Sequence, residues 1–183
     1  PDDYLMGYTL GEDLAARNPC DSGGKKVGII SGYKDTCCAG ERTRGVLDAL
    51  SDTDYEIQFT INVTYETSIT EMFMQQKPVD YLIVLETGIL EEIAKILSDK
   101  QENGMKVYGI GSSIKCVYYL DEAVIDGLIV VDGYDMGYQS VLQISDMLKK
   151  RLHRTKDQAT DYRLLHREDI FSEDTQKFLY TFY

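Results

Sequence analysis

The feature that most constrains the fold is a unit that recurs along the chain: a short apolar segment, a polar turn and then a helical pattern. The apolar segments span 27–30, 55–63, 79–86, 106–112, 128–131 and 162–169, and the helical patterns span 39–52, 69–73, 88–104, 115–121, 133–150 and 172–182. Strands that alternate with helices predict an α/β fold whose strands run mainly parallel. We therefore expect a three-layer α/β/α sandwich, a Rossmann-like single lobe with a mainly parallel sheet of five to six strands.

A further helix is predicted ahead of the first strand, over residues 1–17. Its apolar residues and its glycines lie on two adjacent faces, with Met6, Leu10 and Leu14 on one and Gly7 and Gly11 on the other. Such a helix has to pack on the sheet that follows it. No Pro- or Ser-rich linker and no internal repeat divides the remainder, so we expect one domain.

The position of a binding site follows from the predicted topology. Right-handed crossovers place the loop after each parallel strand along one edge of the sheet. Ligands of such folds bind at that edge, outside the carboxyl ends of the strands. The loops that would form it span 33–40, 62–66, 86–88, 111–113 and 132–134.

Charge and hydropathy argue against two classes of protein. The net charge of −12 at pH 7 leaves little to neutralise a phosphate backbone, so binding to nucleic acid is not expected. No stretch approaches the roughly 18 apolar residues of a membrane span, and no signal peptide is evident. The chain begins at Pro1 rather than at an initiator methionine, so we expect the natural N-terminus to lie upstream.

Cysteine and histidine are the usual ligands of zinc, but their spacing here forms no zinc motif. There is no CxxC pair and no cluster among Cys20, Cys37, Cys38, Cys116, His153 and His166. A metal is therefore not expected. The adjacent Cys37 and Cys38 are either a redox-active pair or two small buried residues at the start of a helix, and we expect the second.

Motifs of several enzyme classes are missing as well. The segment after the first strand, GIISGYKDTCCAGE, has the wrong spacing for a dinucleotide fingerprint, and no GxxxxGK[ST] loop occurs. No GxSxG nucleophile elbow is found, and neither histidine lies in a predicted site loop to act as a base. A thiol nucleophile at Cys37 or Cys38 would lack a local partner. Neither catalysis nor a cofactor is expected.

Six segments, taken in order, resemble one known family. They are DDYLMGYTLGEDLA, GKKVGIISG, GERTRGVLDAL, VYGIG, VVDGYDMGYQSV and HREDI. The order resembles the C-terminal lobe of the type 1 periplasmic binding proteins, which include ribose-binding solute receptors of ABC transporters and the effector domains of lac-repressor-like regulators. The resemblance covers nearly the whole chain. It implies that residues 1–183 are one lobe of a two-lobe receptor, with the N-terminal lobe outside this chain.

In that family two lobes face each other across a hinge and close on a small polar ligand, often a sugar. The resemblance implies that the turn Asp132-Gly133-Tyr134 lies at the hinge and the cleft. The residues themselves leave a simpler interpretation open, in which Asp132 or Asp135 only caps the helix that follows.

The resemblance also implies a set of ligand-binding residues, namely Tyr33, Gly40, Glu86, Thr87, Gly111, Ser112 and Asp132. Four hydrogen-bonding groups of the family's sugar site are replaced, at Gly40, Glu86-Thr87, Gly111 and Val131. A buried sugar hydroxyl without a partner costs about 1–3 kcal/mol, so an unmodified sugar site is not expected. Arg42 matches the family's structural arginine, for which we expect an internal ion pair.

Two of these residues bear on the nature of the ligand. Glu86 offers a carboxylate where the family usually has a neutral amide, which favours a ligand with an amine or another donor. Alternatively, Glu86 pairs with Arg42 or Lys34 across neighbouring loops. Tyr33 lies in the right loop to stack on a ligand ring.

Two biological roles remain open. The first is the substrate-binding component of an ABC importer, anchored outside the membrane and partnered by a permease. The second is the effector-sensing domain of a cytoplasmic transcriptional regulator. The ending YRLLHREDIFSEDTQKF resembles that of transport receptors, whereas free cysteines favour a reducing compartment. In either role, a lone lobe is expected to bind its ligand weakly and to self-associate through the surface that normally faces its partner.

Overall fold

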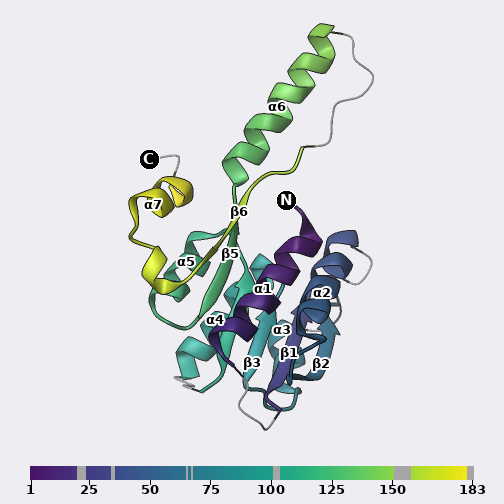
Figure 1. Ribbon diagram of the computed structural model, residues 1–183, viewed down its shortest axis with the longest axis vertical. Coiled ribbons are helices and arrows are strands. Elements are labelled where there is room, and N and C mark those ends of the chain that lie inside the picture. Colours follow the sequence, from purple (N-terminus) through teal and green to yellow (C-terminus); the bar gives the residue numbers. More distant parts are fainter. Residues whose placement is uncertain are drawn as a thin grey trace.

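The computed structural model describes residues 1–19, 24–33, 36–64, 66, 68–100, 104–150 and 158–180. Within these ranges one six-stranded sheet has the order β2-β1-β3-β4-β5-β6 (Figure 1). Its strands are β1 (Lys26–Ser31), β2 (Glu56–Asn62), β3 (Tyr81–Val84), β4 (Lys106–Ile110), β5 (Gly127–Val131) and β6 (Tyr162–Leu165). Strands β1 to β5 pair in parallel, and β6 pairs antiparallel with β5 at the edge. The predicted mainly parallel sheet is confirmed.

Helices cover both faces of the sheet, as a three-layer sandwich requires. On one face lie α1 (Asp3–Arg17) and α2 (Cys37–Leu50), and on the other lie α3 (Ile69–Met74), α4 (Thr87–Lys100) and α5 (Ile114–Asp121). The helix α6 (Gly133–Lys150) follows β5, whereas the short 3₁₀ helix η1 (Arg167–Asp169) and α7 (Glu173–Leu179) follow β6.

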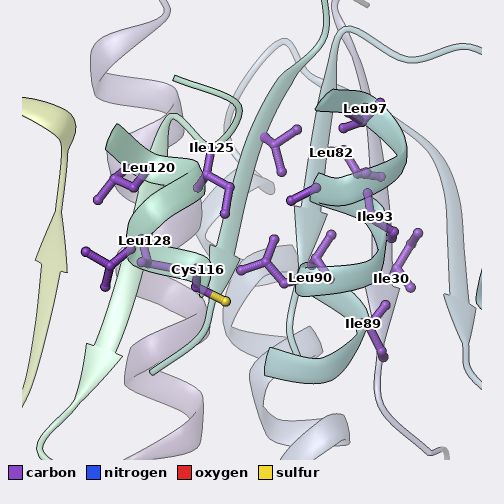
Figure 2. Packing of buried hydrophobic residues seen from close by; sticks show 14 of the residues in the cluster. Ile30, Leu82, Ile89, Leu90, Ile93, Leu97, Cys116, Leu120, Ile125 and Leu128 are labelled. Atoms are coloured by element: carbon purple, nitrogen blue, oxygen red, sulfur yellow. The ribbon is translucent and has the colours of Figure 1, made fainter. Parts of the chain in front are cut away.

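The sheet separates two apolar cores because successive strand residues point to opposite faces. In β3, Leu82 belongs to the core under α4 and α5, whereas Ile83 belongs to the core under α1 and α2. Figure 2 shows the first of these cores, with Leu90 and Ile93 of α4 beside Leu82. Both residues of β3 are fully buried. The near-continuous apolar run of this strand reflects burial on both faces.

Glycines let α1 and α2 approach very closely. A Cβ atom added at Gly7 would overlap the Arg42 carbonyl group, and one added at Gly11 would lie 2.8 Å from the Cβ atom of Ala49. On the other helix, a Cβ atom at Gly45 would overlap the Tyr4 carbonyl oxygen. The predicted glycine face of the first helix is therefore the face that contacts α2, while Met6, Leu10 and Leu14 are buried in the core.

Polar side chains cap the N-termini of several helices. The side chain of Asp2 accepts a hydrogen bond from the Leu5 amide at the start of α1, with a distance of 3.0 Å. Ser113 does the same for α5, and Ser172 does so for α7. Each of them satisfies an amide that has no partner within its own helix.

Helix α6 leaves the body of the molecule at the carboxyl edge of the sheet (Figure 1). The structure describes all of its 18 residues, and none of them is buried. One side carries an exposed apolar stripe, which we call the α6 stripe: Tyr134, Tyr138, Val141, Ile144 and Leu148. In the described ranges, no helix is both long enough and apolar enough to cross a membrane.

Candidate functional site

The carboxyl edge of the sheet gathers residues that are far apart in the sequence. Tyr33 comes shortly after β1, Glu86 after β3, Ser112 after β4 and Asp132 directly after β5. These four strands are neighbours and run parallel, so the four residues occur in that order along one edge. The residues predicted for the site thus lie at the predicted edge of the sheet, whatever they bind.

Arg42 connects α2 to this edge. Its Nε atom lies 2.7 Å from Oδ1 of Asp3 in α1, and its Nη1 atom donates to the Leu85 carbonyl oxygen at 2.9 Å. The same Nη1 atom lies 3.5 Å from Oε2 of Glu86. The expected internal ion pair of Arg42 is confirmed, and so is the pairing of Glu86 with Arg42. Lys34, the other partner considered for Glu86, lies outside the described residues.

The Glu86 carboxylate is nevertheless only partly engaged. Its side chain is 48% exposed, whereas that of Arg42 is 16% exposed. Arg42 also makes its shorter contacts with Asp3 and Leu85 rather than with Glu86. Glu86 therefore presents negative charge to the space above the edge.

The loop after β1 is shaped by polar residues that the sequence analysis did not single out. The Asn62 side chain donates to the Gly32 carbonyl oxygen at 2.9 Å, which ties this loop to the end of β2. Ser31 is buried and donates to the Ala39 carbonyl oxygen at 3.2 Å. These bonds hold the backbone that leads to Tyr33, whose side chain is 37% exposed. Asn62 does fall in a predicted site loop, so the topology alone indicated its neighbourhood.

Three further predicted residues differ in what they can offer a ligand. Gly40 is exposed within α2, and a Cβ atom there would meet no atom within 4 Å. Thr87 begins α4 and is half-buried. Gly111 is buried, and a Cβ atom there would lie 2.6 Å from Sγ of Cys116. Gly111 therefore serves close packing against α5, and Cys116 fills the space that a side chain at this position would need.

Asp132 has a structural task. Its Oδ1 atom accepts a hydrogen bond from the Asp135 amide at 2.8 Å, which caps α6. The simpler interpretation of Asp132 as a helix cap is confirmed. Ser112 is also engaged, since its Oγ atom accepts from the Val131 amide at 2.9 Å and so ties the loop after β4 to the end of β5.

A pocket of about 440 Å³ lies beside these two residues, between the start of α5, the junction of β5 with α6, and α7. Its lining is mostly apolar and consists of Ser112, Ser113, Ile114, Val117, Val130, Val131, Asp132, Gly133, Tyr134, Phe178, Leu179 and Tyr180. The polar groups of Ser112 and Asp132 thus lie on the wall of a largely apolar hollow.

The prediction that Cys37 and Cys38 are buried is wrong. Both lie at the start of α2 as expected, but Cys37 is exposed and Cys38 is half-buried. The reason is that the buried side of α2 begins only at Ala39. Cys116 is the buried thiol, and burial raises its pKa. Cys20 lies outside the described residues.

No histidine lies at this edge in the part of the chain that the structure describes. His166 lies after the last strand, at the opposite edge of the sheet, and His153 lies outside the described residues. Among the described residues no group of three His, Cys, Asp or Glu side chains could hold a metal ion. The described chemistry of the edge is that of carboxylates, hydroxyls, the Arg42 guanidinium, the Asn62 amide, an exposed tyrosine and backbone groups.

Residues 1–152 match a family model described as a periplasmic binding protein domain. Curated protein sequences gave no match to the chain.

Solved structures of similar fold include receptors and a regulator. A carbohydrate transporter solute binding protein from Agrobacterium radiobacter, in complex with D-arabinose, aligns with a TM-score of 0.83 and 17% identity, covering 97% of this chain and 63% of that one. GanP, a glucose-galactose binding protein from Geobacillus stearothermophilus, aligns with a TM-score of 0.76 and 20% identity, covering 93% and 62%. A protein assigned as a LacI transcriptional regulator from Bacteroides fragilis aligns with a TM-score of 0.75 and 15% identity, covering 92% and 61%. The chain spans less than two-thirds of the length of these proteins.

Proposed function

Because this chain belongs to the periplasmic binding protein domain family, we propose that it forms one lobe of a non-catalytic, two-lobe receptor that closes on a small polar ligand. The observation that carries the proposal is the alignment of candidate residues, one after each of four neighbouring strands, along one edge of the sheet. Open α/β sheets bind their ligands at this edge. The similar solved receptors are longer than this chain, which leaves room in the whole protein for a second lobe.

The ligand of the receptor would be a sugar-type molecule that carries an amine or another hydrogen-bond donor. Glu86 supports this, because its side chain is 48% exposed and its ion pair with Arg42 is long, with 3.5 Å between Oε2 and Nη1. Gly111 gives a second argument against a plain sugar, because a buried glycine has no side chain that could accept a hydrogen bond from a sugar hydroxyl. Tyr33 would contribute its ring as a stacking surface.

The second lobe would cover the α6 stripe. Complete burial of one large apolar side chain contributes about 1.5–3 kcal/mol, so five exposed ones leave several kcal/mol unrealised in this chain alone. Tyr134 begins the stripe next to the candidate site, and Leu148, near its far end, is 78% exposed. Packing against α6 would therefore hold the second lobe above the carboxyl edge. Without that lobe, the same stripe would promote self-association.

In the cell, the receptor would act outside the cytoplasmic membrane, held by an anchor and delivering its ligand to an ABC permease. Two similar structures are a carbohydrate transporter solute binding protein and a glucose-galactose binding protein. The alternative is an effector-sensing domain of a lac-repressor-like regulator in the cytoplasm, favoured by the similarity to the Bacteroides fragilis protein. The coding sequence upstream of residue 1 separates the two roles. A signal peptide with a lipidated cysteine supports the receptor, and a helix-turn-helix supports the regulator.

Titration of the chain with D-arabinose, D-glucose and D-glucosamine, followed by NMR, tests the proposed site. We expect millimolar or weaker affinity, with shifts at the carboxyl edge. Each exposed hydrogen bond nets only about 0.5–1.5 kcal/mol, while immobilising a ligand costs about 4 kcal/mol or more. Micromolar binding by this lobe alone would show that closure of two lobes is the wrong mechanism. Shifts confined to the opposite edge of the sheet would show that the site is misplaced.

A further inference from the structure

His166 is a buried histidine at the amino edge of the sheet, away from the candidate site. It directly follows β6, and its side chain is only 7% exposed. The ring atom Nδ1 lies 2.8 Å from the Asp126 carbonyl oxygen, and Nε2 lies 3.2 Å from Oδ1 of Asp13. Both ring nitrogens therefore face an oxygen that can accept a hydrogen bond.

This arrangement determines where protons have to be. A carbonyl oxygen can only accept, so Nδ1 must carry a hydrogen and donate it to Asp126. In a neutral ring, Nε2 would then be bare and would face a carboxylate oxygen of Asp13 with no hydrogen between them. When the ring is an imidazolium, Nε2 also donates, and the contact becomes a charge-assisted hydrogen bond.

The surroundings of Asp13 favour the charged ring. Its Oδ2 atom is buried without a hydrogen-bond partner in the described structure, so the contacts of this carboxylate are concentrated at Oδ1. The other cation at Oδ1 is Arg17, whose Nε atom is 3.4 Å away and whose Nη1 atom is engaged by Glu168 at 3.0 Å. His166 is thus the more buried of the two basic partners of the Asp13 Oδ1 atom.

We propose that His166 is a proton-operated latch, whose imidazolium joins Asp13 of α1 to Asp126 in the turn between α5 and β5. The latch fixes the end of β6, which is an edge strand paired only with β5. It is complete while the ring holds its second proton. When the pH rises and that proton leaves, the link to α1 is lost and the end of β6 is held less firmly.

Other titratable or charged groups also face this place. They are Asp13 and Arg17 of α1, Lys106 and Tyr108 of β4, Asp126 before β5, and Arg167, Glu168 and Asp169 after β6. Burial raises the pKa of Tyr108 to about 12, so its phenol stays uncharged over the working range. Burial also raises the pKa of the Asp126 carboxyl group. A pocket of about 330 Å³ next to the ring gives solvent protons access to it.

The sequence contains only two histidines, so a His153→Gln background leaves His166 as the one imidazole to observe. In this background, nitrogen-15 NMR of the ring reports its protonation directly. We expect both ring nitrogens to be protonated at about pH 7, because each of them faces an oxygen that can accept a hydrogen bond. A neutral ring with a bare Nε2 at that pH would overturn the proposal, even if the variants below did not fold.

The Asp13→Asn variant tests whether the contact between His166 and residue 13 needs the second proton of the ring. An asparagine amide can donate to the bare Nε2 of a neutral ring, so the link no longer needs the second proton. We expect the unfolding constant of the parent to rise more steeply with pH than that of Asp13→Asn. Asp146→Asn removes an exposed acid of α6 and should behave like the parent. Equal pH dependence in the parent and in Asp13→Asn would also refute the latch.

Discussion

Gly45 of α2 lies directly against the Tyr4 carbonyl oxygen of α1, and no methyl group fits between them. A Cβ atom at this position would also lie 2.6 Å from the Tyr8 amide nitrogen. Both neighbours are backbone, so they can give way only if the two helices move apart. The closeness of α1 and α2 therefore depends on this glycine.

The first prediction is that Gly45→Ala destabilises the chain by about 1–3 kcal/mol, as overpacking does. The measurement is urea unfolding followed by circular dichroism. Gly40→Ala in the same helix is the matched control, because a Cβ atom there meets nothing within 4 Å. That control should be neutral or stabilising by up to about 1 kcal/mol, since alanine is the better helix former. Equal effects of the two substitutions would contradict the packing argument.

The second prediction concerns Arg42. Arg42→Gln removes the contacts with Asp3, Leu85 and Glu86 from a side chain that is only 16% exposed, and should destabilise the chain by about 1–3 kcal/mol. Arg42→Lys should not restore stability, because a single ammonium cannot reproduce the forked geometry. Arg44→Gln is the control. Its ion pair with Glu41 is exposed, and its loss should matter by less than about 1 kcal/mol in the same unfolding measurement.

The third prediction tests the charge of the ligand. Glu86→Gln should weaken the NMR-detected binding of D-glucosamine and leave that of D-glucose unchanged, because only the amine gains from the carboxylate. Glu122→Gln changes an exposed acid at the end of α5, away from the carboxyl edge, and should affect neither sugar. Equal losses for both sugars in Glu86→Gln would mean that Glu86 only supports Arg42.

The fourth prediction is that the α6 stripe mediates self-association. The double variant Val141→Lys, Ile144→Lys places two charges in the stripe and should shift the chain towards the monomer in sedimentation velocity. Its stability should not fall, since both side chains are already exposed. Gln139→Lys with Gln143→Lys adds the same charge to the other side of α6 and should leave association as it is. A parent chain that is monomeric at high concentration would refute the idea outright.

The fifth prediction concerns thiol reactivity in a Cys20→Ser background. Cys37 is exposed and should react quickly with a disulfide reagent, whereas Cys116 should react only on unfolding. Burial both shields the Cys116 thiol and raises its pKa, so less of the reactive thiolate is present at a given pH. Cys37→Ser should remove one fast equivalent, and Cys116→Ser should remove none. A fast reaction at Cys116 would indicate that α5 opens readily.

Much of the fold could be predicted because its main signals are local. The alternation of apolar segments with helical patterns located all six strands, and the glycine face of residues 1–17 was found from spacing alone. The antiparallel direction of β6 could not be read in this way, since YRLL is compatible with either direction. The strand predicted over 162–169 also ends early, at Leu165, because the Asp169 side chain accepts from the His166 amide and starts a 3₁₀ turn instead.

The site was predicted less completely because it depends on long-range packing. The predicted residues do lie at the carboxyl edge of the sheet, since right-handed crossovers place them there. The burial of Gly111 depends on Cys116, which lies in the next helix, and the exposure of Cys37 depends on which residues of α2 face the core. No sequence pattern distinguishes an amphipathic helix that packs on its own sheet from one, like α6, whose apolar side has no cover in the described structure.

Helix α6 is inserted between the ends of two paired strands, so the sheet does not depend on it. Val131, at the end of β5, is paired with Tyr162, at the start of β6, and the Asp132 amide donates to the Asp161 carbonyl oxygen at 3.1 Å. The chain thus leaves the sheet at Val131 and returns to it at Tyr162, and these two positions are neighbours on the adjacent strands β5 and β6 (Figure 1). A tight two-residue turn could bridge the same gap. The segment between β5 and β6 can therefore be lengthened, exchanged or deleted while the six-stranded sheet keeps its register.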